Sequence, residues 1–389
     1  MLRTEFFTPL NDPGFDLAGS DIPDSLAANV AVHSLKNGFP DVENARIAII
    51  GIPEYRGSVF NRNFKSGTDE IREKLYRLKL HDKPSYLVDF GDLIPGNTLE
   101  DTYFALTEIL SELLTRRIIP VVIGGSNDLA FPFYNAYKSF NKLINIASID
   151  SRFDLGLPEE SFNSSTWLGK VILQQPNYLF NFSNIGYQTY FVGSASVDLM
   201  NKLYFDAYRL GQVRTDITEM EPVIRTADLL TVDLSAIRQS DAPGNSNPSP
   251  NGFTGEEVCQ AMMYAGLNDH LSGLGIFEFE TATDRQGQTA HLVAQMIWYF
   301  IEGVNNRKND FPSPNHSGFI TYRVTIESMS RELVFLKHKT SGRWWMEMPE
   351  SEPKNRLNRN NFLPCSNKDY LQACANEMPD RYWQALQKL

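Results

Sequence analysis

The chain has 389 residues, 42% of them hydrophobic, which is enough for one large domain or two ordinary ones with a sizeable core. Its 36 Lys and Arg residues against 47 Asp and Glu residues give a net charge of −11, which argues against nucleic acid or an anionic membrane as the main partner. No apolar run approaches the ~20 residues that span a bilayer, and we expect no signal peptide. The three cysteines form no CxxC motif, so reduced thiols in a cytoplasmic protein are expected.

Short apolar runs alternate with amphipathic stretches through most of the chain. The stretches 99–116, 254–266 and 288–304 predict helices. Nearly uninterrupted apolar strands indicate burial on both faces, and their alternation with helices predicts an α/β fold with a parallel sheet between two helical layers. The runs that we expect to form strands are 46–52, 85–91, 118–125, 143–150, 189–193, 229–235 and 273–280.

The sequence changes character after about residue 310. The runs "GFITYRVTI", "ELVFLKHK" and "GRWWMEMP" predict strands with short turns, and 366–389 predicts one or two helices with Ser366 as an N-cap. We therefore divide the chain into an N-terminal segment packed on the core (1–45), a main domain (46–309) and a small C-terminal α+β extension (310–389). The paired Trp344 and Trp345 predict that the extension needs a large apolar partner and packs on the main domain.

Polar side chains follow four of the expected strands. In a parallel sheet these strand ends meet at one crevice, where ligands bind. Several carboxylates in one crevice repel each other unless a cation lies among them, and that cation could be a metal ion or Arg152. The segments "GGSND", "DSRFD", "TVDLS" and "IFEFE" bring the candidates, which are Asn127, Asp150, Arg152, Asp154, Asp233, Ser235 and Glu278.

At these residues the sequence resembles the ureohydrolases, the family of arginase, agmatinase and formimidoylglutamase. The blocks "SGTDEIREKLYRL", "GGSND", "DSRFD", "TVDLSAIRQSDAPG" and "IFEFETATDRQGQTAHLVAQMI" follow in the family's order over roughly residues 46–305. The resemblance implies a three-layer arginase-like α/β fold. It also implies a family chemistry in which two manganese ions activate water to attack the carbon of a guanidino or amidino group.

The resemblance also assigns the six metal-ligand positions of the family. Aspartates are kept at Asp150, Asp154 and Asp233, so at most one ion is expected there. The other three positions hold Asn127, Arg152 and Ser235, and the substrate-binding glutamate is kept as Glu278.

Arginine offers only donors and cannot ligate a metal. We therefore expect the Arg152 guanidinium to fill the second metal position. It should lie within hydrogen-bond reach of Asp150 or Asp233, with Glu278 as a further candidate partner. If such a pair is buried, Arg152→Ala should destabilise the fold by about 3–5 kcal/mol.

Two functions follow from this pattern. The leading hypothesis is a pseudoenzyme that lacks the binuclear manganese centre, holds no cofactor and acts as a binding, scaffold or regulatory protein with a protein partner or as a homo-oligomer. The alternative is an active hydrolase of C–N bonds in linear amidines, formimidoylglutamase-, agmatinase- or arginase-like. It would use Mn²⁺ or Mg²⁺ at a reduced site and bind a small guanidino or amidino ligand.

Overall fold

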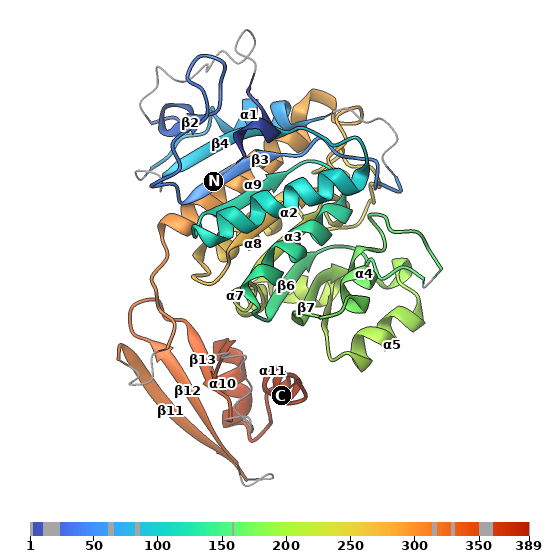
Figure 1. Cartoon of the computed structure of the whole chain (residues 1–389). Coiled ribbons are helices and arrows are strands. Elements are labelled where there is room, and N and C mark those ends of the chain that lie inside the picture. Colours follow the sequence, from blue (N-terminus) through green and yellow to red (C-terminus); the bar gives the residue numbers. More distant parts are fainter. Residues whose placement is uncertain are drawn as a thin grey trace.

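A ten-stranded sheet forms the centre of the molecule in the computed structural model, which describes residues 3–10, 24–60, 66–81, 86–157, 159–312, 317–327, 331–349 and 361–388 (Figure 1). The strand order is β1-β4-β3-β5-β10-β9-β6-β7-β8, with β2 also on β4. Every pair is parallel except β1 with β4. The strands are β1 (Phe7–Thr8), β2 (Val30–Val32), β3 (Ile47–Gly51), β4 (Leu87–Leu93), β5 (Ile119–Ile123), β6 (Ile144–Ile149), β7 (Leu179–Tyr187), β8 (Asp206–Arg209), β9 (Leu229–Asp233) and β10 (Gly273–Phe277).

Six of the seven expected strands of this sheet are present as β3, β4, β5, β6, β9 and β10. The seventh expectation is wrong, because residues 189–193 hold a short 3-10 helix, Thr189–Phe191, and the strand is β7, immediately before it. Buried polar residues interrupt the apolar pattern of β7: Asn181 and Ser183 both bond to Asp206 on β8. This cross-strand bonding depends on the fold, so the sequence pattern alone did not reveal the strand.

Helices cover both faces of the sheet and complete the three layers that were expected. The buried residues of one face belong to α1 (Thr68–Leu75), α6 (Leu210–Thr215), α7 (Met220–Arg225), α8 (Gly255–Leu267) and α9 (Gln288–Asn305). The other face carries α2 (Leu99–Thr115), α3 (Ala130–Tyr137), α4 (Trp167–Leu173) and α5 (Ser194–Lys202). None of the helices in the described ranges is long and apolar enough to cross a membrane.

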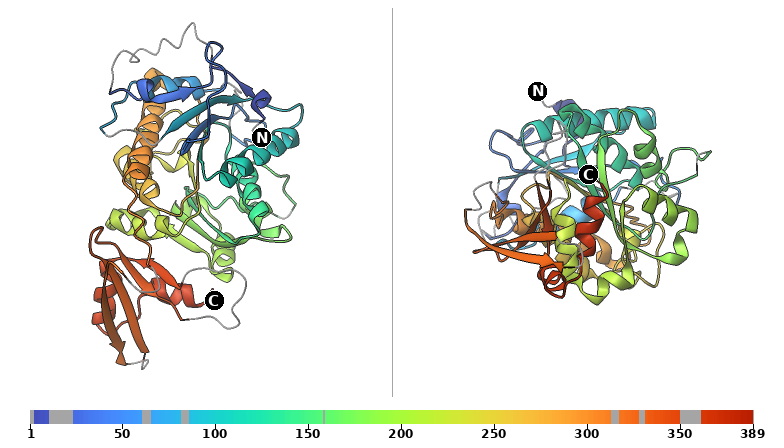
Figure 2. Two further views of the ribbon diagram at one scale, coloured as in Figure 1. Left: turned by 60° about the vertical axis from the view of Figure 1, so that its left-hand side comes forward. Right: turned by 90° about the horizontal axis from the view of Figure 1, so that it is seen from below.

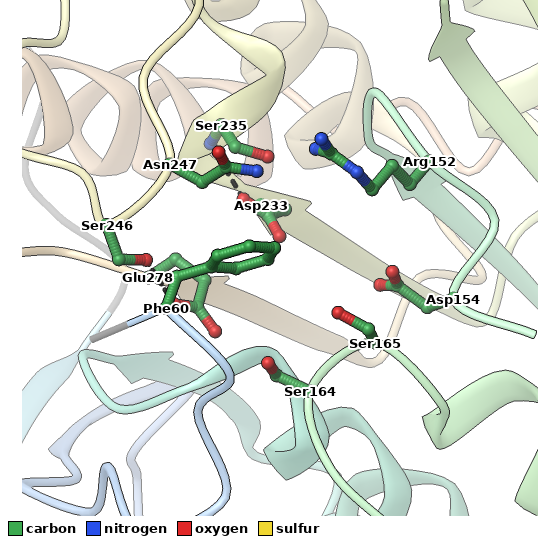
Figure 3. Close-up of a pocket in the computed structure, with 10 residues that line it drawn as sticks. All are labelled: Phe60, Arg152, Asp154, Ser164, Ser165, Asp233, Ser235, Ser246, Asn247 and Glu278. Carbon is green, nitrogen blue, oxygen red and sulfur yellow. Dashed lines mark hydrogen bonds between the residues drawn. The ribbon is translucent and has the colours of Figure 1, made fainter. Parts of the chain in front are cut away.

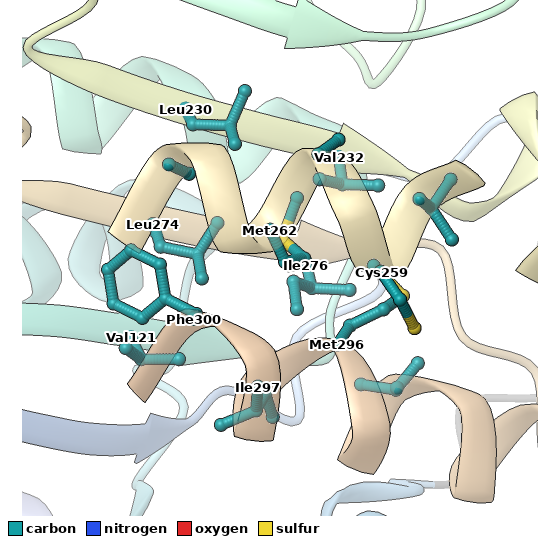
Figure 4. Packing of buried hydrophobic residues seen from close by; sticks show 14 of the residues in the cluster. Val121, Leu230, Val232, Cys259, Met262, Leu274, Ile276, Met296, Ile297 and Phe300 are labelled. Atoms are coloured by element: carbon teal, nitrogen blue, oxygen red, sulfur yellow. The ribbon is translucent and has the colours of Figure 1, made fainter. Parts of the chain in front are cut away.

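The largest apolar layer lies between the sheet and helices α8 and α9 (Figure 4). Met262 on α8 and Phe300 on α9 are fully buried, and they pack with Leu274 and Ile276 of β10. Burial of each such side chain contributes about 1.5–3 kcal/mol relative to exposure. This packing fixes β9 and β10, whose carboxyl ends carry two of the candidate site residues.

A separate antiparallel sheet forms after the main domain, with strand order β11-β12-β13-β14. Its strands are β11 (Phe319–Ile326), β12 (Arg331–His338), β13 (Trp344–Glu347) and β14 (Phe362–Cys365), followed by α10 (Asn367–Cys374) and α11 (Asp380–Leu386). Ser366 caps α10 as expected, because its hydroxyl accepts from the backbone N–H of Lys368. Figure 2 shows this sheet and its helices at one end of the molecule.

The two tryptophans of the extension pack mainly within it, so the expectation that they need a large apolar partner outside is wrong. The Trp344 ring stacks on Tyr370, with centroids 5.1 Å apart, and Trp345 meets the edge of Phe319 at 5.4 Å. The main domain contributes Arg225, whose guanidinium lies over the Trp345 ring at 4.3 Å. The face of the small sheet that carries Trp345 is therefore covered by aromatic residues of the extension and by the guanidinium of Arg225.

Polar contacts join the extension to the amino-terminal side of the main sheet. Arg225 donates to the carbonyls of Trp344 and Cys365, both at 3.1 Å. Lys388 donates to Asn181 at the start of β7 and to Asp206 at the start of β8. The extension thus lies at the strand edge opposite the candidate crevice and leaves that crevice open.

Candidate metal and amidine site

The candidate residues follow β5, β10, β9 and β6, four adjacent strands of the sheet. Asn127 comes after β5, Asp150 directly follows β6, Asp233 ends β9 and Glu278 directly follows β10. The sheet therefore brings together residues far apart in the chain at its carboxyl edge, as expected for a parallel α/β sheet. Two glycines after β5, Gly124 and Gly125, have φ angles of +82° and +74°, which turn the chain into the crevice.

Three buried carboxylates form the centre of the site. Asp150, Asp154 and Asp233 each offer an oxygen, and these three atoms lie within 4.8 Å of one another. The three residues are each at most 9% exposed. Such a cluster of hard oxygen donors has the chemistry that Mg²⁺ and Mn²⁺ prefer.

Neighbouring donors hold these carboxylates in place. The Asn127 amide nitrogen donates to Asp154 at 2.7 Å and to Asp150 at 3.4 Å, and the Trp167 indole donates to Asp154 at 3.2 Å. The Asn127 amide oxygen is buried, and no described group donates to it. Asn127 is thus in direct contact with two of the three acids, and its amide oxygen remains available to accept a hydrogen bond or to bind a cation.

Burial raises the pKa values of all four acids, and repulsion by a neighbouring carboxylate adds to it for Asp150, Asp154 and Glu278. Burial is the largest cause for each of them. With the charge of Asp233 nearby, it raises the pKa of Asp154 to about 7 and that of Glu278 to about 8. The pKa of Asp150 lies well above its usual value, through burial and then the charges of Asp154 and Asp233. Burial also raises the pKa of Asp233, although the hydrogen bonds from Ser235 and the charge of Arg152 oppose the rise. A cation among these groups would reverse the effect by favouring the ionised forms.

Arg152 does not supply that cation, so the expectation that its guanidinium pairs with Asp150, Asp233 or Glu278 is wrong. Only its backbone N–H bonds to Asp150, at 2.8 Å, and its guanidinium forms no ion pair with any described acid. Figure 3 shows the side chain reaching toward Ser235 and Asn247, away from Asp154.

Aromatic rings explain the position of Arg152. Its guanidinium lies 4.2 Å from the Phe191 ring centroid and 5.8 Å from that of Phe60. A guanidinium stacks well on aromatic faces, and these contacts keep it at the rim of the crevice. The expected loss of 3–5 kcal/mol for Arg152→Ala assumed a buried ion pair, and that premise does not hold.

Glu278 lies at the base of the crevice in a left-handed backbone conformation, with φ of +67°. Its carboxylate accepts from the hydroxyls of Ser246 and Ser58, at 2.5 and 3.2 Å, and from the backbone N–H of Asn127 at 2.9 Å. Asp154 also has a positive φ, +50°. Strained backbone of this kind gathers at functional sites, because the surrounding structure must hold it.

Ser235 occupies a buried position beside Asp233. Its backbone N–H donates to Asp233 at 2.7 Å, and its hydroxyl lies 3.4 Å from that of Ser151. Neither Ser235 nor Arg152 provides a carboxylate or an imidazole, so the donors for a second cation are not brought together here.

The crevice also contains residues that were not among the predicted site residues. Phe60 lies over the pocket, and Ser246 and Asn247 line it (Figure 3). The last two belong to the turn-rich segment "GNSNPSPNG", whose place after β9 was the one signal available. The enclosed space has a volume of about 10 Å³, which is room for about one water molecule.

A three-layer α/β protein with a carboxylate-lined crevice at the carboxyl edge of its sheet is the class that this fold and site define. Comparison with known families then identifies the chain more closely. Residues 45–302 match the Arginase family, and the chain belongs to that family.

The curated relatives of this chain include formimidoylglutamases of low identity. That of Lysinibacillus sphaericus is 24% identical over 270 residues, covering 66% of this chain and 81% of its own. That of Hahella chejuensis is 26% identical over 275 residues, covering 65% and 83%. At the level of fold, the crystal structure of Trypanosoma cruzi formiminoglutamase with Mn²⁺ is similar with a TM-score of 0.63 and 22% identity, covering 69% of this chain and 96% of that one.

Proposed function

We propose that this protein is a metal-dependent hydrolase of C–N bonds in a linear amidine or guanidine, working with a single Mn²⁺ or Mg²⁺. The observation that carries the proposal is the cluster of Asp150, Asp154 and Asp233. These buried acids form no ion pair with any basic residue of the described chain. Uncompensated buried carboxylates cost several kcal/mol each, so without a counter-charge the acids are held protonated, and a cation from outside the chain would stabilise their ionised forms. The names of the curated relatives support the same class of reaction.

In this proposal the three aspartates and the free amide oxygen of Asn127 would hold the ion. An ion at this position supplies positive charge that lowers the pKa of nearby water and stabilises developing negative charge. Trp167 keeps Asp154 in position through its indole N–H. Glu278, oriented by Ser58 and Ser246, would accept N–H bonds from the amidine and so place its carbon beside the aspartates.

A second candidate is a non-catalytic binding, scaffold or regulatory protein. One observation favours it: Arg152 and Ser235, the residues at two of the family-equivalent positions, provide no ligand for a second ion. Such a protein could still bind one ion and an amidine without hydrolysing it. We place either form in the cytoplasm and expect no nucleic-acid partner, because the chain is acidic and its cysteines are few.

Metal content and turnover together test the proposal. The full chain is purified, its Mn and Mg are measured by elemental analysis, and release of formamide, ammonia or urea from N-formimidoyl-glutamate, arginine and agmatine is followed with added Mn²⁺. We expect about one ion per chain and turnover of at least one amidine, both lost in Asp233→Asn. An ion without turnover would favour the binding protein. Absence of both ion and turnover would contradict the proposal.

A further inference from the structure

The Arg152 guanidinium is a cation at the rim of the site that forms no ion pair with an acid of the described residues. Its Nη1 donates to the Ser151 hydroxyl at 3.3 Å. With the Asn247 amide oxygen turned toward the guanidinium, Nη1 and Nη2 donate to that oxygen at 2.8 and 3.2 Å. These acceptors are neutral, and no described carboxylate pairs with the side chain, which is half-buried.

These contacts leave one edge of the guanidinium available. The group has five N–H donors, and the three hydrogen bonds use both hydrogens of Nη1 and one of Nη2. The Nε–H and the second Nη2 hydrogen have no acceptor among the described residues. This is the edge that binds a carboxylate through two parallel hydrogen bonds.

The side chain is also fixed in place before any ligand arrives. Phe191 lies against the guanidinium plane, and Asn247 bridges its two terminal nitrogens. Holding a flexible arginine in one conformation removes much of the entropy cost of using it to bind a ligand. A solvated surface arginine would not be restrained in this way.

Charge is divided across the pocket. Asp154, Asp233 and Glu278 are on one side, and Arg152 and Asn247 are on the other (Figure 3). A ligand that matches both sides has a cationic end at the acids and an anionic end at the arginine. The pocket has room for about one water molecule, so it must widen to admit such a ligand. The exposed side chain of Phe60 covers the entrance and would have to move.

We propose that Arg152 is a specificity-determining residue that binds the anionic group of the ligand, so that the site prefers amidines or guanidines ending in a carboxylate over those ending in a cation. The inference rests on the proposed function for the placement of the amidine end at Glu278. The inference does not require turnover, because the preference can be measured as a difference in binding affinity between two ligands.

Two probes of similar length test this preference directly. Both 4-guanidinobutyrate and agmatine carry a guanidinium, but the first ends in a carboxylate and the second in an ammonium. We expect titration calorimetry on the full chain with Mn²⁺ to give a dissociation constant for 4-guanidinobutyrate at least about tenfold below that for agmatine. Arg152→Gln should abolish most of this ratio by weakening 4-guanidinobutyrate alone.

Two further variants serve as controls. Arg152→Lys keeps the charge but not the paired donors, so it should retain only part of the ratio. Arg116→Gln removes the same charge from the surface of the protein, where Arg116 pairs with Glu112, and should keep the full ratio. An unchanged ratio in Arg152→Gln, equal affinities in the unmodified chain, or binding of neither probe would overturn the inference. Loss of turnover with the ratio intact would contradict only the proposed function.

Discussion

The negative and the positive side chains of the site differ in burial and in the groups that they contact. The acids are buried side by side with amide and indole donors around them, whereas the nearby cation stacks on aromatic rings at the rim. A buried ion pair would have neutralised Asp233 from within the chain. Since no such pair forms in the described residues, the negative charge of the cluster is available for an ion from solution.

Arg72 provides the contrast that makes the role of Arg152 testable. Its guanidinium is fully buried and donates to Asp89 at 2.9 and 3.1 Å and to Asp92 at 2.6 Å. We expect Arg72→Ala to lower the free energy of unfolding by about 3–5 kcal/mol, because it leaves buried acids unpaired. Arg152→Gln should change it by about 1 kcal/mol, since it removes a stacking contact and hydrogen bonds to neutral groups.

Urea unfolding of the two variants beside the unmodified protein measures both effects. The m-value should stay the same in all three, so that the midpoints report stability. A loss in Arg152→Gln as large as that in Arg72→Ala would show that Arg152 neutralises the carboxylates after all.

Among the elements, the C-terminal extension contributes to the fold without reaching the crevice. Its sheet has its own aromatic core, yet Arg225 of α7 is 6% exposed and depends on extension carbonyls for its hydrogen bonds. Arg381 of α11 also pairs with Glu219 of the main domain. The extension and the main domain are thus joined by ion pairs and by hydrogen bonds to carbonyls, with the Arg225 guanidinium stacked on Trp345 among them.

Deletion of residues 310–389 should therefore destabilise the main domain. The deletion uncovers α7 and removes the cations that pair with Glu219 and Asp206. We expect the 1–309 chain to melt at lower temperature and to aggregate during size-exclusion chromatography. Arg225→Ala in the full chain should lower the melting temperature without aggregation. A monodisperse 1–309 chain of unchanged stability would refute this role of the extension.

At the scale of the whole molecule, the raised pKa values link stability to pH and to metal. The folded-state pKa of Asp154 is about 7, against about 4 for an unfolded aspartate. The folded state therefore favours the protonated acid, so this contribution to stability is complete below pH ~4 and is lost as the pH rises to about 7. A bound cation removes the penalty by holding the carboxylates ionised.

Metal should consequently stabilise the protein more at pH 8 than at pH 5. At a concentration about 100 times its dissociation constant, an ion adds about 2.7 kcal/mol. We expect Mn²⁺ to raise the melting temperature by several degrees at pH 8 and very little at pH 5, as measured by differential scanning calorimetry. In Asp233→Asn the effect of Mn²⁺ should disappear. An equal shift at both pH values would point to binding elsewhere.

Much of this protein follows from the sequence itself. Nearly unbroken apolar runs identified β3, β5, β6, β9 and β10, because strands covered on both faces have no regular polar side to interrupt the pattern. The same reasoning placed Asn127, Asp150, Asp233 and Glu278 at one edge, since parallel strands end together.

Only the tertiary structure decided which of these residues interact. Arg152 is next to two aspartates in the chain, but side chains that come from distant segments, Phe60, Phe191 and Asn247, determine where its guanidinium lies. The strand β7 was hidden for the same reason, because its polar residues are satisfied by β8 and Lys388. Local sequence fixes which groups a strand end offers, whereas the packing of distant loops fixes the direction in which a long, flexible cation points.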